Sequence, residues 1–108
     1  MTWTVETLNE TVDAELAALP VDMRARLVRI SELIESVGLL NVKEPHVRHI
    51  RSRLWEIRLK GKAGIARALC VTAKEQRVVI LRAFIKKTEK TPPGEVELAL
   101  QRAKDVKP

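Results

Sequence analysis

Seven residues in the middle of the chain have side chains that can bind phosphates or act on them. Five are cations, one is a carboxylate and one is aromatic: Arg58, Lys60, Arg67, Arg82, Lys86, Glu56 and Phe84. Guanidinium and ammonium groups bind phosphate oxygens and stabilise the charge that develops on a phosphodiester in a transition state. An aromatic ring beside them is a stacking platform for a base. The pattern alone slightly favours a solvated surface, with Glu56 paired to an arginine, over such a site.

Three consecutive antiparallel strands are predicted to carry these residues. The segments are rich in β-branched and aliphatic residues, and Gly61, Gly64 and a later polar turn separate them at hairpin distances. The predicted strands are Leu54–Lys60, Ile65–Thr72 and Arg77–Lys86.

The two turns also predict how these strands pair. A first turn centred on Lys62 places Arg58 opposite Arg67, and the second turn places Arg67 opposite Phe84. Because side chains alternate along a strand, all seven residues then share one face. The other face is apolar and is expected to hold Trp55, Ile57, Leu59, Ala66, Ala68, Cys70, Leu81, Ala83 and Ile85.

The rest of the chain predicts one more strand, three helices and a loop. Helical spacing of apolar residues, capping residues, Pro20 and Gly38 indicate where the helices lie. The predictions are an edge strand at Trp3–Glu6, helices from Thr7 or Asn9 to Ala18, at Val21–Val37 and at Pro92–Lys104, and a loop at Leu39–Ser52. The first two helices would cover the apolar face and leave the cationic face open, which makes residues 1–108 a single α+β domain.

The predicted loop is basic and adjoins the cationic face. Arg48, His49 and Arg53 could extend that face toward further phosphates, as could Lys87 after the last strand. His46 and His49 lie three residues apart, but no cysteine or carboxylate stands near them at a recognisable ligand spacing. We therefore expect no metal site.

Composition narrows the class of protein. Twenty Lys and Arg against fourteen Asp and Glu give a net charge of +6, which favours a polyanionic partner. The single cysteine, Cys70, cannot form an internal disulfide, and no apolar run is long enough to cross a membrane. No glycine loop for a nucleotide cofactor precedes a helix. We expect a cytoplasmic protein without a cofactor.

Five blocks of sequence carry a family resemblance that covers nearly the whole chain. They are ELAALP at 15–20, PHVRHI at 45–50, LWEIR at 54–58, GIARALCV at 64–71 and FIKKTEKTP at 84–92. In this order and spacing they resemble the phage-derived Gp49-like, HigB-type branch of the RelE/ParE toxin superfamily. The resemblance implies a RelE-like fold, with two N-terminal helices packed on a curved, mainly antiparallel four-stranded sheet and a C-terminal helix.

The resemblance also implies a function and roles for the site residues. Such proteins are toxins of type II toxin–antitoxin pairs, cut mRNA on the ribosome and are silenced by a helix-turn-helix antitoxin. By this likeness, Arg58 and Arg67 would bind and neutralise the scissile phosphate, and Arg82 would stabilise charge on the leaving group. Phe84 would stack on a base, and the lysines would hold flanking phosphates: Lys60, Lys86 and Lys87.

The group that transfers protons is less clear from the resemblance. Relatives often place a Tyr or a His near the end of the sheet or in the tail after it, whereas this chain has no tyrosine. Cys70 stands where a Tyr commonly follows the Arg-x-Leu pattern of the middle strand, and Arg82 stands where many relatives have His. Arginine is too strong a base to exchange protons readily near neutral pH. Lys60, Lys86 and Glu56 are therefore the candidates for the general acid or base.

The sequence thus predicts a metal-independent endoribonuclease that acts on ribosome-bound mRNA, inhibits translation and binds a HigA-like antitoxin. A heterotetrameric toxin–antitoxin complex is left open. Two alternatives keep the same fold: a non-catalytic protein that binds RNA or its antitoxin, and a ParE-like gyrase poison. The cationic face favours RNA as the target rather than gyrase.

Overall fold

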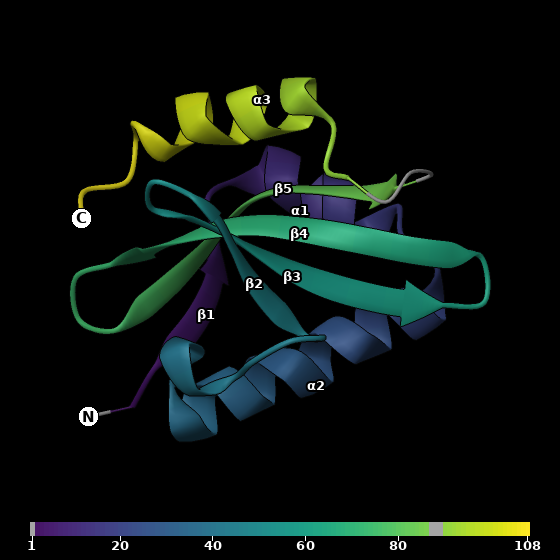
Figure 1. Cartoon of the computed structure of the whole chain (residues 1–108), viewed down its shortest axis with the longest axis horizontal. Helices are drawn as coiled ribbons and strands as arrows, with labels where there is room; N and C mark the ends of the chain where they lie inside the picture. Colours follow the sequence, from purple (N-terminus) through teal and green to yellow (C-terminus); the bar gives the residue numbers. More distant parts are fainter. Residues whose placement is uncertain (1, 87–89) are drawn as a thin grey trace.

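A mixed five-stranded sheet with helices on both faces forms the structure (Figure 1). The computed structural model describes residues 2–86 and 90–108. The elements in chain order are β1 (Thr4–Thr7), α1 (Glu10–Ala17), α2 (Val21–Val37), the 3-10 turn η1 (Leu39–Asn41), β2 (Val47–Arg51), β3 (Leu54–Gly61), β4 (Gly64–Ala73), β5 (Arg77–Lys86) and α3 (Pro93–Ala103). The strand order is β1-β5-β4-β3-β2, with β1 parallel to β5 and the other pairs antiparallel.

The predicted loop at Leu39–Ser52 is wrong, because it contains η1 and the edge strand β2. The sheet therefore has five strands rather than four. In β2, Val47 is buried, the next two residues are exposed, and a bulge interrupts the pairing between His49 and Arg51. The bulge removes the regular alternation of apolar and polar residues by which a strand is predicted.

Helices α1 and α2 cover one face of the sheet. In α1, the side chain of Asn9 caps the helix by accepting a hydrogen bond from the N–H of Val12. α2 begins after Pro20 and stops at Gly38, whose φ of 87° favours glycine. Both bounds of α2 agree with the sequence prediction.

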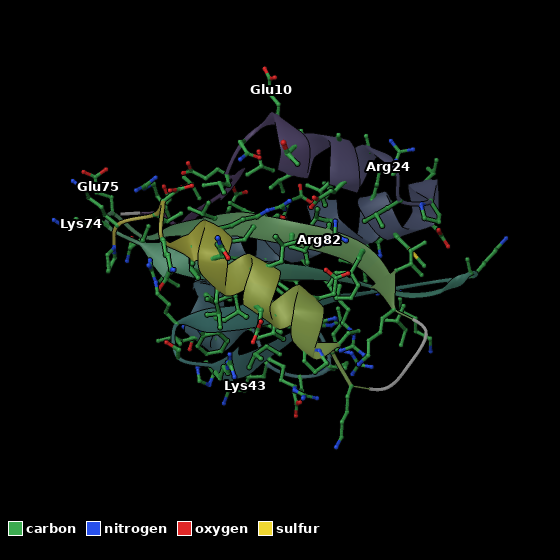
Figure 2. The ribbon with its side chains drawn as sticks, turned by 90° about the horizontal axis from the view of Figure 1, so that it is seen from above. Glu10, Arg24, Lys43, Lys74, Glu75 and Arg82 are labelled. Atoms are coloured by element: carbon green, nitrogen blue, oxygen red, sulfur yellow. The ribbon has the colours of Figure 1, made fainter. Side chains whose placement is uncertain are left out.

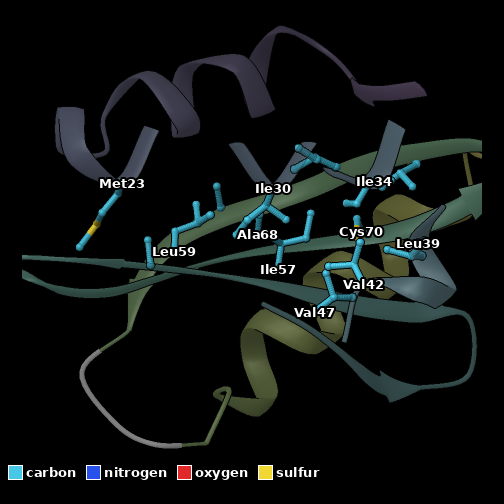
Figure 3. Packing of buried hydrophobic residues seen from close by; sticks show 14 of the residues in the cluster. Met23, Ile30, Ile34, Leu39, Val42, Val47, Ile57, Leu59, Ala68 and Cys70 are labelled. Atoms are coloured by element: carbon cyan, nitrogen blue, oxygen red, sulfur yellow. The ribbon is translucent and has the colours of Figure 1, made fainter. Parts of the chain in front are cut away.

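The main core lies between α2 and the sheet (Figure 3). Small side chains in β4, Ala66 and Ala68, are fully buried there and let the helix approach closely. Burial raises the pKa of the neighbouring Cys70 thiol to about 12, as expected for a structural cysteine rather than a reactive one. The buried residues labelled in the figure are Met23, Ile30, Ile34, Leu39, Val42, Val47, Ile57, Leu59, Ala68 and Cys70.

A bulge in the pairing of β4 with β5 corrects one predicted side-chain orientation. Leu69 pairs with Arg82, but the next residue, Cys70, pairs with Ile80. The extra residue, Leu81, therefore lies on the face covered by α3, whereas the sequence predicted it on the face covered by α1 and α2. Ile80 lies on that α1 and α2 face instead. A single inserted residue exchanges the two faces for everything on one side of it.

The sequence predicted that the second face of the sheet is open, and this prediction is wrong. Helix α3 packs on half of that face (Figure 1). Val96, Ala99 and Ala103 of α3 are buried there against apolar residues of the strands. Those strand residues are Leu54, Leu69, Val71, Val79 and Leu81. Only the other half of this face, toward the β3–β4 turn, remains for polar side chains.

Candidate functional site

The half of the second face beyond α3 gathers most of the predicted site residues. Arg58 lies opposite Arg67, and Arg67 lies opposite Phe84, as the turns predict. Lys60 and Lys86 both lie opposite Ile65, from either side of β4. We call this surface the cationic face, and it consists of Glu56, Arg58, Lys60, Arg67, Phe84 and Lys86.

Glu56 is fully buried within the cationic face and holds Arg67 in place. Its Oε1 accepts a hydrogen bond from Nη1 of Arg67, which is itself only 3% exposed, and its Oε2 accepts one from the hydroxyl of Thr91. A buried ion pair is costly to break, because the charge left behind has no solvent. The pair therefore fixes the Arg67 guanidinium, and both oxygens of Glu56 are already engaged.

Lys86 is a buried cation beside this pair. It is 7% exposed, and its Nζ has no hydrogen-bond partner among the residues that the structure describes. Burial and then the nearby Arg67 guanidinium lower the pKa of Lys86, Glu56 opposes them in part, and Arg48 and Arg58 lower the pKa slightly further. Such an amine loses a proton more easily than an ordinary lysine.

Arg82 belongs to a different cluster, between α1 and α3 (Figure 2). Its Nε and Nη2 donate to the two oxygens of Glu95 at 2.8 and 3.1 Å, and its Nη1 lies 3.0 Å from Oε2 of Glu15. Arg102 of α3 also binds Glu15, at 3.0 Å, and donates to the carbonyl of Leu81. The hydrogen bond with Glu95 raises the pKa of Arg82. This guanidinium joins two helices to the sheet, and its 5.7 Å contact with the Phe84 ring links it to the cationic face.

The predicted extension of the cationic face divides into separate parts. Arg48 is exposed and lies opposite Glu56 in the register of β2 and β3, so it borders the cationic face. His49 pairs with Trp55 and points to the other side of the sheet. Arg53 donates to the carbonyl oxygens of Thr72 and Val106 and so anchors the end of the chain. Lys87 lies outside the described residues.

Comparison with known sequences decides the family. The profile of the family described as phage derived protein Gp49-like (DUF891) matches residues 14–104. The chain belongs to this family. No curated protein matches the sequence.

Solved structures show which fold the Gp49-like chain has. A mutant of the E. coli toxin RelE in the free state superposes with a TM-score of 0.67 at 14% sequence identity, over 94% of this chain and 98% of that chain. The archaeal RelE–RelB complex from Pyrococcus horikoshii OT3 gives 0.59 at 19% identity, over 81% and 98%. The Gp49-like chain therefore has the RelE fold.

Sequence reasoning missed three residues around the site of this Gp49-like chain. Thr91 binds Glu56 from beyond β5, and a contact across 35 residues leaves no signal in the sequence. Arg26 and His46 line a cavity with Arg58 and Lys60. The helical pattern of α2 gives no sign that Arg26 belongs to the site, and the packing of α2 against the β3–β4 turn brings it here.

Residues 2–86 and 90–108 hold no group of three or more His, Cys, Asp or Glu side chains placed to bind a metal ion. In the same residues, no helix combines the length and the apolar composition needed to cross a membrane.

Proposed function

We propose that this Gp49-like protein is the toxin of a toxin–antitoxin pair and that it cleaves mRNA on the ribosome, in the cytoplasm, without a metal ion. The observation that carries the proposal is the cross-strand row of Arg58, Arg67 and Phe84 on a RelE-like sheet, with Arg67 held by buried Glu56. Two cations in register with a ring suit a phosphate next to a base. One structural neighbour is itself named a toxin.

The proposed reaction is an in-line transfer within the RNA strand. The ribose 2′-oxygen attacks the adjacent phosphorus, the bond from phosphorus to the 5′-oxygen breaks, and a 2′,3′-cyclic phosphate and a 5′-hydroxyl form. Arg58 and Arg67 stabilise the charge on the phosphoryl oxygens, and Phe84 stacks on a base. Lys60 and Arg48 bind flanking phosphates.

Proton transfer falls to Lys86 in this scheme. The 2′-hydroxyl must lose a proton and the leaving 5′-oxygen must gain one, and arginine is too basic to exchange them. Lys86 has a lowered pKa and an unpartnered Nζ, whereas both oxygens of Glu56 are engaged. A lysine whose pKa is lowered by burial and by neighbouring cations suits general acid–base catalysis. Arg82, bound to two carboxylates, acts as a positioning residue for Phe84 and α3.

The proposed partner is an antitoxin, of the helix-turn-helix, HigA-like kind that the sequence predicts. A structural neighbour is a RelE–RelB complex, which shows that a protein of this fold assembles with a second protein. Co-expression with the product of the adjacent reading frame and isolation of the complex tests this partnership. A toxin that kills in the presence of that product would contradict it.

Primer extension on cellular mRNA after brief induction tests the proposed reaction. We expect discrete cuts within coding regions that disappear when translation initiation is blocked. Arg58→Ala should reduce cleavage about 100-fold, the usual loss when one charge-stabilising donor is removed. Arg58 suits this test better than Arg67 because it forms no ion pair within the described residues.

Arg51→Ala is the matched control, because it removes an exposed arginine from the neighbouring strand β2. It should leave the cuts at the level of the natural protein. Uncut mRNA in cells arrested by the natural protein, or full cleavage by Arg58→Ala, would contradict the proposal. Arrest by loss of DNA supercoiling would support the gyrase reading instead.

A second candidate function is RNA binding without cleavage. The burial of Arg67 and Lys86 favours it, because neither side chain offers much surface to a substrate in this structure. Ribosome association of the natural protein without cuts, and its loss in Arg58→Ala, would support this second candidate.

A further inference from the structure

A cavity of about 260 Å³ opens at the edge of the sheet where β2 ceases to cover β3. Pairing of the two strands runs only as far as Ile57, and one more hydrogen bond joins the N–H of Arg58 to the carbonyl of His46, at 2.9 Å. Beyond that point β3 has a strand neighbour on one side only. The cavity is lined by Arg26, Pro45, His46, Arg58, Lys60 and Ile65.

The start of α2 is fixed against this end of the sheet. Oδ2 of Asp22 accepts a hydrogen bond from the backbone N–H of Lys62, at 2.8 Å, in the β3–β4 turn. Arg26 lies four residues further along α2, and residues at this spacing share a face of a helix. The contact between Asp22 and Lys62 therefore brings Arg26 to Arg58 and Lys60.

The arginines that line this cavity differ from the other buried or partly buried arginines in their hydrogen-bond partners. Seven arginines of the chain are buried or partly buried, and five of them bind a carboxylate or a carbonyl oxygen. The two that bind neither, within the part of the chain that the structure describes, are Arg26 and Arg58. Both line the cavity, and Nε of Arg58 is inaccessible to solvent without a hydrogen-bond partner.

A buried hydrogen-bond donor without a partner is uncommon in a folded protein and is usually satisfied by a ligand, an ion or water. Here Lys60 adds a third cation, and none of the described lining residues is a carboxylate. The backbone adds one more donor, because Arg58 directs its N–H away from β4 and Lys60, two residues further along the strand, directs its own the same way. These cations and donors favour binding of an anion in the cavity.

The other walls of the cavity suit a ring. Pro45 and Ile65 are apolar, and His46 is a flat aromatic side chain. Pockets for small ligands begin at about 300 Å³, and this open cavity of about 260 Å³ lies just below that size, so it would hold one nucleotide unit at most. Lining and size together indicate a phosphate at one end and a base or ribose at the other.

We propose that the cavity is a subsite for one nucleotide of an RNA strand that crosses the cationic face. Arg26, Arg58 and Lys60 bind its phosphate, and Pro45, His46 and Ile65 contact its base or ribose. Arg58 belongs to both surfaces, so a strand that leaves Phe84 and Arg67 reaches the cavity with its next nucleotide. This inference rests on the proposed function, because it takes the ligand to be RNA.

Binding of adenosine 5′-monophosphate to the 108-residue chain, followed by NMR, tests the subsite without any cleavage. We expect saturable shifts of the His46 ring and Ile65 methyl signals, and weaker binding of adenosine or inorganic phosphate alone. Arg26→Ala should raise the Kd for the nucleotide roughly tenfold, because it removes a charged hydrogen-bond donor. His46→Ala should weaken binding of the nucleotide but not of phosphate.

Arg24→Ala is the matched control on the same helix. Arg24 is exposed, donates to the carbonyl of Leu19 and does not line the cavity, yet its loss changes the net charge equally. Equal weakening by both variants would overturn the subsite and indicate a general charge effect. Phosphate that binds as tightly as the nucleotide would also overturn it, because the site would then recognise an anion only.

The same preparations separate this inference from the proposed function. A nucleotide that binds the cavity of a protein that cuts no mRNA would contradict the endonuclease and leave the subsite standing. Cuts in mRNA by a protein whose His46 and Ile65 signals do not respond to the nucleotide would overturn the subsite alone.

Discussion

Two groups of basic side chains differ in how the fold neutralises them. Arg82 and Arg102 both bind Glu15, and Arg82 also binds Glu95, so that α1 and α3 are joined to the sheet. Arg26, Arg58 and Lys60 meet no carboxylate in the described structure, although the first two are partly buried. The first group stabilises the fold, and the second is available to a ligand. Pairing, rather than the number of positive charges, therefore separates the structural cations of this chain from the candidate binding site.

The largest effect is expected where a paired cation is buried. Arg67→Ala leaves Glu56, which is fully buried, without its ion-pair partner. Such losses cost about 3–5 kcal/mol of unfolding free energy. Denaturant unfolding measures the change, and a loss below 1 kcal/mol would mean that Glu56 readily finds another partner or a proton.

The second-largest effect is expected at the junction of the two helices. Arg82→Ala removes bonds to Glu95 and Glu15 and should cost about 2 kcal/mol, as hydrogen bonds to charged groups do. Arg77→Ala is the control, because its ion pair with Glu6 is exposed and should contribute less than about 0.5 kcal/mol. Equal losses in the two variants would show that the cluster does not stabilise α3.

A smaller effect of opposite sign is expected at Lys86. Lys86→Met should raise the unfolding free energy by about 1 kcal/mol, because it removes a buried ammonium that has no hydrogen-bond partner among the described residues. The folded-state pKa of Lys86 is lowered from 10.5, so the unfolded chain binds more protons between the two values. The natural protein should therefore regain stability relative to Lys86→Met as the pH rises toward 10.5.

Denaturant unfolding from neutral to alkaline pH measures the difference in unfolding free energy between Lys86→Met and the natural protein, and this gap should narrow as the pH rises. A gap that widens with pH would show that the folded-state pKa of Lys86 is raised instead. Lys86→Met should also abolish mRNA cleavage if Lys86 transfers the proton.

The smallest effect on stability is expected at Arg58, although its loss should reduce cleavage about 100-fold. Arg58→Ala breaks no ion pair, so the melting temperature should stay within about 2 °C of that of the natural protein. Thermal unfolding followed by circular dichroism measures it. A fall comparable to that of Arg82→Ala would move Arg58 into the structural group and remove the contrast between the two.

Local chemistry made much of the fold predictable. The stripe of apolar residues between Pro20 and Gly38 defined α2 correctly, and turn residues at hairpin distances defined the pairing of Arg58, Arg67 and Phe84. These signals work because a helix and a hairpin depend on neighbouring residues. The pairing of β2 was missed because its bulge breaks the alternation on which such a prediction depends.

By itself, the amino-acid sequence determined where the three helices and the β3–β4 and β4–β5 hairpins lie, and that the cations of the three central strands share a face. Only the tertiary structure decided which of those cations are neutralised. Glu15, Arg82, Glu95 and Arg102 meet from three elements, and α2 delivers Arg26 to the cavity through Asp22. Both arrangements join residues that are distant in the chain, and such contacts depend on how whole elements pack rather than on local spacing.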